Sequence, residues 1–302
     1  MKRDNEIIFE SGKNTNQIYS STFPFSSYKF DKILLISVSI LVTIGLLMVY
    51  SASNAFARER LGDSFYYLKR QMLSFCISAI VMILAMFLDF RIYQRLAWTF
   101  ILLSFILLIL IYIPNVGIKS GGSTRWLKIG KYSFQPVEFV KISLIIYMAR
   151  FLSQKAEYMS NFKRGILPVL VVLSVFLVLI YRQPDFGSVI LISSIAFLML
   201  FVGGAKIYQI VLLVMLAGIF VGYEIWQEPY RLRRWFAFLE PWKDPEGIGY
   251  HIIQSFYAFG SGGVWGSGLG AGVQKLHYLP TPHTDFIFSI IGEELGLALC
   301  LI

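Results

Sequence analysis

A carboxylate stands at the start of the last apolar run of this chain of 302 residues. Asp285 ends a polar stretch that begins at His277, and Phe286 opens the apolar run. An aspartate in this place either caps the N-terminus of a helix or serves as a general base in a partly desolvated site. A free aspartate has a pKa of about 3.9, and partial desolvation raises it toward the range where a base works near neutral pH.

A second polar group lies where Pro136 begins another apolar run. Glu138 and Lys141 are three residues apart, so they share one helix face and can form an ion pair. An ionisable side chain inside a membrane span costs roughly 2.5–3.5 kcal/mol. The pair is therefore expected to face protein or a watery cavity, and both a structural ion pair and a substrate cavity remain open.

A third polar group, Gln183-Pro184-Asp185, joins two apolar runs. Pro184 and the nearby Gly187 stop a helix and permit chain reversal, which predicts an antiparallel helical hairpin. Asp185 either caps the second helix of this hairpin or contributes to a site.

The elements that carry these groups are predicted to be membrane helices. Hydrophobic residues make up 56% of the chain and charged residues only 15%, against about 25% charged in soluble domains. Lipid offers no partner to unpaired backbone groups, so apolar spans must be helical. We expect an all-α polytopic membrane protein with about eight transmembrane helices, at residues 33–50, 72–88, 96–113, 137–152, 166–181, 188–202, 207–226 and 286–302.

One long loop, residues 227–285, separates the last two spans. It is rich in aromatic residues, and its segments 230–239 and 249–259 have the pattern of short amphipathic helices at a membrane interface. Seven glycines between Gly260 and Gly272 match no phosphate-binding motif. They indicate close backbone turns rather than nucleotide binding.

The net charge of +9 comes from small basic clusters between the apolar runs. This pattern is typical of anchoring to anionic lipid headgroups, not of nucleic-acid binding. Twelve Lys and Arg on the side of the N-terminal head, against nine in the short loops opposite, favour a cytoplasmic head. We expect residues 1–32 to be a disordered cytoplasmic tail. Cys76 and Cys300, both in apolar runs, give no disulfide framework and no metal site.

Taken together, these motifs resemble the SEDS family of shape, elongation, division and sporulation proteins, the FtsW and RodA type. They occur in family order from about Tyr50 to the end of the chain. They are Arg125-Trp126, Gln135-Pro136-x-Glu138, Gln183-Pro184-Asp185-x-Gly187, Pro229-Tyr230-Arg231-x-Arg233-Arg234, Pro241-Trp242-x-Asp244-Pro245, Gly249-Tyr250-His251-x-x-Gln254-Ser255, Gly268-x-Gly270, Gln274-Lys275, Leu279-Pro280, His283-Thr284-Asp285-Phe286-Ile287-Phe288 and Gly292-Glu293-Glu294-Leu295-Gly296.

The resemblance implies a ten-helix inner-membrane fold and a peptidoglycan glycosyltransferase that polymerises lipid II outside the membrane. Its implied partners are a class B penicillin-binding protein, other division proteins and membrane lipids, with no nucleic acid. The family's essential loop aspartate falls on Asp285, which places the loop 227–285 outside the cell. The motifs at 228–231, 240–242 and 275–280 look more like the division and sporulation branch than the elongation branch, which favours the division septum as the location.

Two departures from the family pattern stand out. Thr281 occupies a position where the family usually has glutamate after Leu-Pro. The family's last two helices are missing, so the chain is expected to be a fragment truncated at its C-terminus.

The implied reaction is an inverting glycosyl transfer, in which Asp285 takes the proton of the attacking sugar hydroxyl. The departing diphosphate needs positive charge. No cofactor and no metal ligand is assigned, and a divalent cation, Mg²⁺ or Mn²⁺, is left open. The candidate substrate-binding residues are Arg125, Glu138, Lys141, Gln183, Asp185, Arg231, Arg234, Gln254, Ser255, Lys275 and His283.

Three other functions remain open at this point. A transporter that flips lipid II would need the Glu138–Lys141 pair but not Asp285 as a base. An elongation-type polymerase would share the chemistry. A non-catalytic scaffold of a division complex would need neither polar site.

Overall fold

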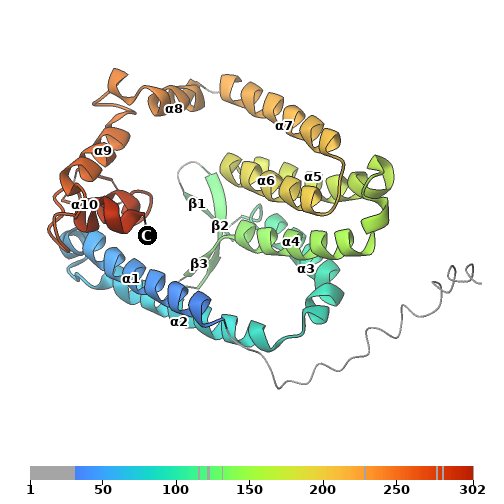
Figure 1. Cartoon of the computed structure of the whole chain (residues 1–302), viewed down its shortest axis with the longest axis horizontal. Coiled ribbons are helices and arrows are strands. Elements are labelled where there is room, and N and C mark those ends of the chain that lie inside the picture. Colours follow the sequence, from blue (N-terminus) through green and yellow to red (C-terminus); the bar gives the residue numbers. More distant parts are fainter. Residues whose placement is uncertain are drawn as a thin grey trace, which may run out of the picture. The chain divides into compact units, whose positions relative to one another are not determined.

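The computed structural model describes residues 31–301 except 115, 121, 122, 131, 228, 277 and 281 (Figure 1). Residues 1–30 of the expected tail at 1–32 and the departure at Thr281 therefore lie outside the described residues, whereas Asp31 and Lys32 of that tail belong to the start of α1. The chain divides into two compact units, one made of Met1–Met72 with Gln254–Ile302 and the other of Leu73–Ile253.

The first unit is built around α1 (Lys32–Leu61) and α10 (Ile287–Cys300), which pack against each other. Asp31 caps α1, because its side chain accepts the amides of Ile33 and Leu34 at 3.0 and 3.1 Å. The small core of this unit consists of Met48, Ala52, Leu279 and Ile290. Helices α2 (Tyr66–Phe87) and α9 (Tyr250–Gly262) each begin in one unit and end in the other.

The second unit holds the remaining elements. In chain order they are α3 (Phe90–Leu110), β1 (Gly117–Ser120), β2 (Ser123–Ile129), β3 (Tyr132–Phe134), α4 (Pro136–Gln154), the 3-10 turn η1 (Ala156–Tyr158), the π turn η2 (Phe162–Ile166), α5 (Leu167–Tyr181), α6 (Phe186–Val202), α7 (Ile207–Gln227), α8 (Pro229–Leu239) and the 3-10 turn η3 (Pro241–Lys243). The core of this unit comes mainly from α3, α4, α5 and α6.

Helix α5 shows why these helices suit a bilayer. Phe176 is buried in the core of its unit, yet Val178, on another face of the same helix, is 55% exposed. A helix that is apolar on every side is typical of a membrane span. The exposed apolar side chains are expected to contact lipid.

The helical membrane fold is confirmed, and each of the eight predicted spans corresponds to a helix. Within the described residues, five are long and apolar enough to cross a membrane: α1, α2, α3, the combined stretch Phe162–Tyr181, and α7. Of the other three, α6 and α10 are too short, with 17 and 14 residues. Helix α4 carries Glu138, Lys141 and Arg150 along its length. The chain is a multi-pass membrane protein.

The two amphipathic segments predicted in the long loop are also helices, α8 and α9. On α8, the large side chains of Trp235, Phe236 and Phe238 are exposed. This exposure agrees with a helix that lies at a membrane interface.

A small antiparallel sheet, in the order β1-β2-β3, was not predicted. Its register pairs Ile118 with Trp126 and Leu127 with Phe134. Alternate residues of a strand point to opposite faces, and Leu127 is buried against the core of its unit. The sheet holds β2, which carries Arg125, between β1 and β3, and β3 leads into α4.

Replacement of Phe176 by alanine should destabilise the protein by about 3 kcal/mol, because it leaves a cavity among packed side chains. Phe201 on α6 is 55% exposed, so Phe201→Ala is the matched control and should change stability by less than about 0.5 kcal/mol. Thermal unfolding of both variants in detergent measures the difference. Equal losses would mean that α5 does not pack as described.

Candidate functional site

Arg125 holds the turn between α5 and α6. Its guanidinium donates to the carbonyl oxygens of Gln183, at 3.3 Å, and Pro184, and lies 3.8 Å from a carboxylate oxygen of Asp185. The planar guanidinium can serve several acceptors at once. The structure therefore brings together the candidates Arg125, Gln183 and Asp185, but Arg125 is engaged with the turn itself.

Asp185 caps α6, as one of the two sequence interpretations predicted. Its carboxylate accepts the amide of Ser188 at 3.3 Å and the Ser188 hydroxyl at 2.8 Å. Both Gln183 and Asp185 are buried. Their places in the turn are those of residues that shape the backbone.

The predicted pair of Glu138 and Lys141 is present, with Lys141 Nζ 2.6 Å from Glu138 Oε2. The Glu138 side chain is 56% exposed and that of Lys141 only 19%. Lys141 also borders a groove between α4, α5 and α6 that is otherwise lined by apolar side chains such as Leu144, Leu173 and Ile192.

In the other unit, Asp285 lies on the turn directly before α10 and is exposed. The N-cap position of α10 belongs to Phe286, and no side chain caps this helix. The capping interpretation of Asp285 is therefore wrong. An accessible carboxylate on a turn is free to meet a substrate.

His283, two residues before Asp285, packs among aromatic rings of α1 and α2. Its ring centroid lies 4.3 Å from that of Tyr67 and 5.8 Å from that of Phe56. Its Nδ1 is buried and has no hydrogen-bond partner among the described residues. Burial lowers the pKa of His283 below its usual value of 6.5. The neutral ring is thus the favoured form beside Asp285.

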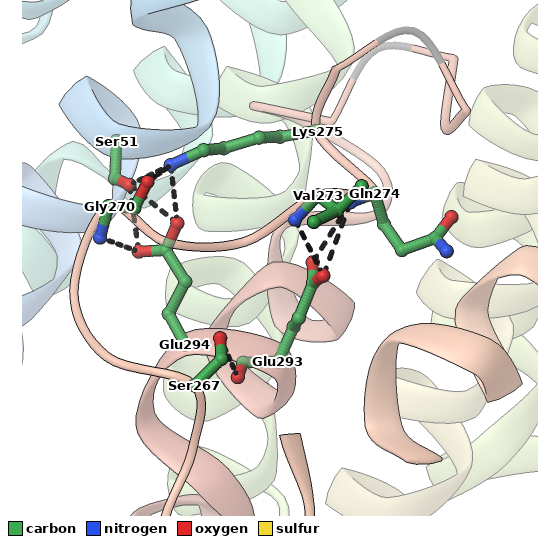
Figure 2. Close-up of polar contacts among 8 residues, drawn as sticks. All are labelled: Ser51, Ser267, Gly270, Val273, Gln274, Lys275, Glu293 and Glu294. Carbon is green, nitrogen blue, oxygen red and sulfur yellow. Dashed lines mark hydrogen bonds and ion pairs between the residues drawn. The ribbon is translucent and has the colours of Figure 1, made fainter. Parts of the chain in front are cut away.

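Lys275 is buried within its unit (Figure 2). Its ammonium lies 2.6 Å from Glu294 Oε1, 3.0 Å from the Ser51 hydroxyl and 2.8 Å from the Gly270 carbonyl oxygen. An ammonium has three donors, and these three acceptors occupy them. Lys275 is therefore part of an internal network in this structure, which was not expected from the sequence.

The remaining candidates lie on α8 and α9. Gln254 and Ser255 are half-buried on α9. Arg234 is exposed on α8, and Arg231 belongs to the same helix. These positions leave Arg234 accessible to a ligand from outside the protein.

Sequence reasoning quoted Glu293 and Glu294 only as part of a family motif, assigned no role to them, and missed Glu224. Glu293 and Glu294 in α10 are 2% and 1% exposed, and Glu224 in α7 is 8% exposed. Glu224 accepts a hydrogen bond of 2.8 Å from the Tyr181 hydroxyl. The available signal was a glutamate inside an apolar helix, which is costly unless it has a partner.

Comparison with known proteins agrees with the sequence pattern. Residues 31–302 match the model of the FtsW, RodA and SpoVE cell cycle proteins. The chain is 43% identical over 273 residues to the probable peptidoglycan glycosyltransferase FtsW of Trichlorobacter lovleyi, covering 90% of this chain and 72% of the relative. It is 44% identical over 269 residues to stage V sporulation protein E of Bacillus subtilis, covering 88% of this chain and 73% of the relative.

Solved structures share the fold. A chain of a peptidoglycan synthase complex superposes with a TM-score of 0.69 at 23% identity, covering 91% of this chain and 74% of that one. The rod shape determining protein RodA of Thermus thermophilus gives a TM-score of 0.56 at 23% identity, covering 89% and 69% of the two chains. The described helices therefore form a known membrane fold.

Gly262, the last residue of α9, tests the contact of this helix with α10. A Cβ at Gly262 would collide with the Gly292 carbonyl oxygen and lie 2.8 Å from the Glu293 Cα. Gly262→Ala should therefore destabilise the protein by about 1–3 kcal/mol. Gly260 has open space around it, so Gly260→Ala is the control and should be neutral or stabilising by up to about 1 kcal/mol. Thermal unfolding in detergent compares them, and equal behaviour would contradict the close approach.

The lowered pKa of His283 predicts a pH dependence of stability. The unfolded chain takes up the proton at a higher pH than the folded protein, so stability falls as pH drops through the usual value of 6.5. In His283→Gln the loss of Tm between about pH 7 and pH 5 should be smaller than in the wild type. The control His251→Gln, at an exposed position, should keep the pH dependence of the wild-type Tm. If His283→Gln also kept it, the lowered pKa of His283 would not be its cause.

Proposed function

Because the chain belongs to the FtsW, RodA and SpoVE family of cell cycle proteins, we propose that it is a peptidoglycan glycosyltransferase that polymerises lipid II in septal wall synthesis and cell division. The observation that carries the proposal is Asp285, an exposed carboxylate with no capping role, on the turn that leads into a membrane helix. Relatives named as this enzyme match about nine-tenths of the chain.

Asp285 acts as the general base. It takes the proton from the 4-hydroxyl of the acceptor sugar while that oxygen attacks C1 of the donor sugar. A new C1–O bond forms and the bond from C1 to the diphosphate oxygen breaks, which inverts C1. The polyprenyl diphosphate leaves with the electron pair. The glycan chain grows by one disaccharide for each lipid II consumed.

The leaving diphosphate requires positive charge close by. Arg125 and Lys275 are engaged inside the protein, and the sequence candidates Arg231 and Arg234 belong to α8. The described residues contain no group of three or more His, Cys, Asp and Glu that could hold a metal ion. A Mg²⁺ or Mn²⁺ ion in the reaction would take oxygen ligands largely from the substrate diphosphate.

The proposed setting is the bacterial cytoplasmic (inner) membrane at the division septum. The N-terminus lies in the cytoplasm and the segment 227–285, with Asp285, lies outside. A class B penicillin-binding protein is the proposed partner, together with other division proteins. The exposed apolar faces and the aromatic side chains of α8 fit membrane lipids.

The main alternative is a transporter that moves lipid II across the membrane. It is favoured by one observation, the apolar groove bordered by Lys141 and its ion pair with Glu138. A cation at the edge of an apolar groove suits the anionic head of a lipid. An elongation-type polymerase would use the same residues as the proposed enzyme.

Asp285→Asn should abolish glycan formation, with at least a 100-fold loss of rate, because the amide cannot accept the proton. The assay is polymerisation of purified lipid II in liposomes that hold the protein and a class B penicillin-binding protein. The control is Asp63→Asn, which removes an exposed carboxylate that pairs with Lys69 on the turn between α1 and α2. It should polymerise like the wild type.

Glu138→Ala, tested in the same liposomes, distinguishes the enzyme function from the transporter function. Loss of polymer in Asp285→Asn, with translocation of a labelled lipid II unchanged in Glu138→Ala, supports the enzyme. Equal polymer from wild type and Asp285→Asn would remove Asp285 as the base. Loss of translocation in Glu138→Ala alone would favour the transporter.

A further inference from the structure

Helix α10 breaks close to its end. Gly296 has φ 80° and ψ 172°, which is not helical. Beyond the break, the amides of Leu297 and Ala298 donate to the carbonyl oxygens of Gly263 and Val264, at 3.0 Å each. In an unbroken helix these amides would bind carbonyls four residues earlier in α10.

The two carbonyl oxygens left free by the break, those of Glu293 and Glu294, also find partners in the glycine-rich segment 263–272. They accept the amides of Ser267 at 2.9 Å and Gly268 at 3.0 Å. The helix and the segment thus exchange backbone hydrogen bonds in both directions. Helical backbone groups released by a break need new partners where they are buried, and this exchange supplies them and ties segment 263–272 to α10.

Two glycines allow the backbones of α10 and segment 263–272 to approach each other closely. A Cβ at Gly266 would lie 2.6 Å from the Leu295 carbonyl carbon, and one at Gly296 would lie 2.5 Å from the Val264 carbonyl oxygen. Both glycines also have positive φ, at 80°. Larger residues would be excluded by space and by backbone conformation.

The side chain of Glu293 attaches the residues that follow this segment, Val273 and Gln274, to α10. Its Oε1 accepts the amides of Val273 at 2.7 Å and Gln274 at 3.2 Å (Figure 2). The residue is 2% exposed. A buried carboxylate bound to backbone amides fixes the position of those amides.

The neighbouring Glu294 joins three parts of the unit. It pairs with Lys275, accepts the Gly270 amide at 3.0 Å, and accepts the Ser51 hydroxyl from α1 at 2.7 Å. At 1% exposed, it has no access to a substrate. The same holds for Glu293, so neither carboxylate can be the base.

These contacts control the segment that carries Asp285. Asp285 lies between Lys275 and Glu293 in the chain, and each end of this stretch is held by the network. Between them Leu279 is buried in the core with Met48. The exposed Asp285 thus lies in a segment whose two ends are held by the network, with His283 packed against Tyr67 and Phe56 beside it in the chain.

We propose that Glu293, Glu294 and Lys275 are positioning residues that fix Asp285 through segment 263–280. This inference rests on the proposed function, since Asp285 must be the base. It also changes the role of Lys275, from a contact of the substrate diphosphate to an internal anchor. A base that is displaced by about 1 Å loses on the order of 100-fold in rate.

Glu293 gives the sharpest test. Glu293→Ala removes the acceptor of two amides and should lower kcat for lipid II polymerisation about 10- to 100-fold, with KM changed less than about threefold. Glu293→Gln keeps one oxygen that can accept these amides and should retain activity within about threefold of the wild type. The control is Glu59→Ala, at an exposed position of α1 in the same unit, which should leave kcat unchanged.

The ion pair is tested with Lys275→Met and with the double variant Lys275→Met, Glu294→Gln. A single change leaves a buried charge unpaired and is prone to misfold, whereas the double variant removes both charges. Loss of kcat at constant KM in the double variant supports positioning. A rise of KM with constant kcat in Lys275→Met would return Lys275 to the substrate site and overturn its role here.

Hydrogen exchange at the Val273 and Gln274 amides provides a readout independent of activity. Exchange should rise in Glu293→Ala at these amides and not in α4 or α5. Unchanged exchange, or a Glu293→Gln variant as inactive as Glu293→Ala, overturns the inference while Asp285→Asn still decides the proposed function. Absence of glycan from the wild type instead overturns the proposed function and the catalytic part of this inference, and exchange then still decides whether the attachment exists.

Discussion

Backbone groups that cannot reach water must be paired inside the protein, and the broken end of α10 is organised by this constraint. Gly296 ends the helical path, and the groups released there are paired by the glycine-rich segment 263–272. That pairing brings Glu293 and Glu294 against the segment, where their side chains reach further amides and Lys275. The contact with Ser51 then joins α1 to the same network. The attachment of segment 263–275 to α10 thus centres on one interruption of a helix.

The same constraint explains the polar residues of the other unit. Arg125 donates to carbonyl oxygens of the turn between α5 and α6, and Asp185 accepts an amide at the start of α6. Both side chains thereby provide hydrogen-bond partners for backbone groups at the turn, which have no partner within a helix. Asp285 differs from them, because it is exposed and caps nothing. This contrast with Asp185 supports a chemical role for Asp285.

Sequence alone predicted the features that depend on local composition. Apolar runs gave all eight helices, and the amphipathic patterns gave α8 and α9. The position of Asp185 before an apolar run allowed a cap, which is present, but the same position allowed a cap at Asp285, which is not. The sheet was missed because its strands have only 4, 7 and 3 residues, too few for a clear alternation beside long apolar runs. The roles of Glu293, Glu294 and Lys275 were missed because their partners are distant: Glu294 and Ser51 are 243 residues apart. No local pattern reveals a partner at that separation.

That separation has a consequence for the biosynthesis of the protein. At a translation rate of about 5–20 residues per second, the 243 residues between Ser51 and Glu294 take roughly 10–50 s to make. During that interval the side of α1 that bears Met48 and Ala52 lacks its packing partners Leu279 and Ile290. Helix α10 carries two carboxylates, Glu293 and Glu294, which make it costly for this helix to enter lipid before they have partners. Its insertion is expected to depend on an α1 that is already in place, which makes the segment bearing Asp285 one of the last parts of the described chain to mature.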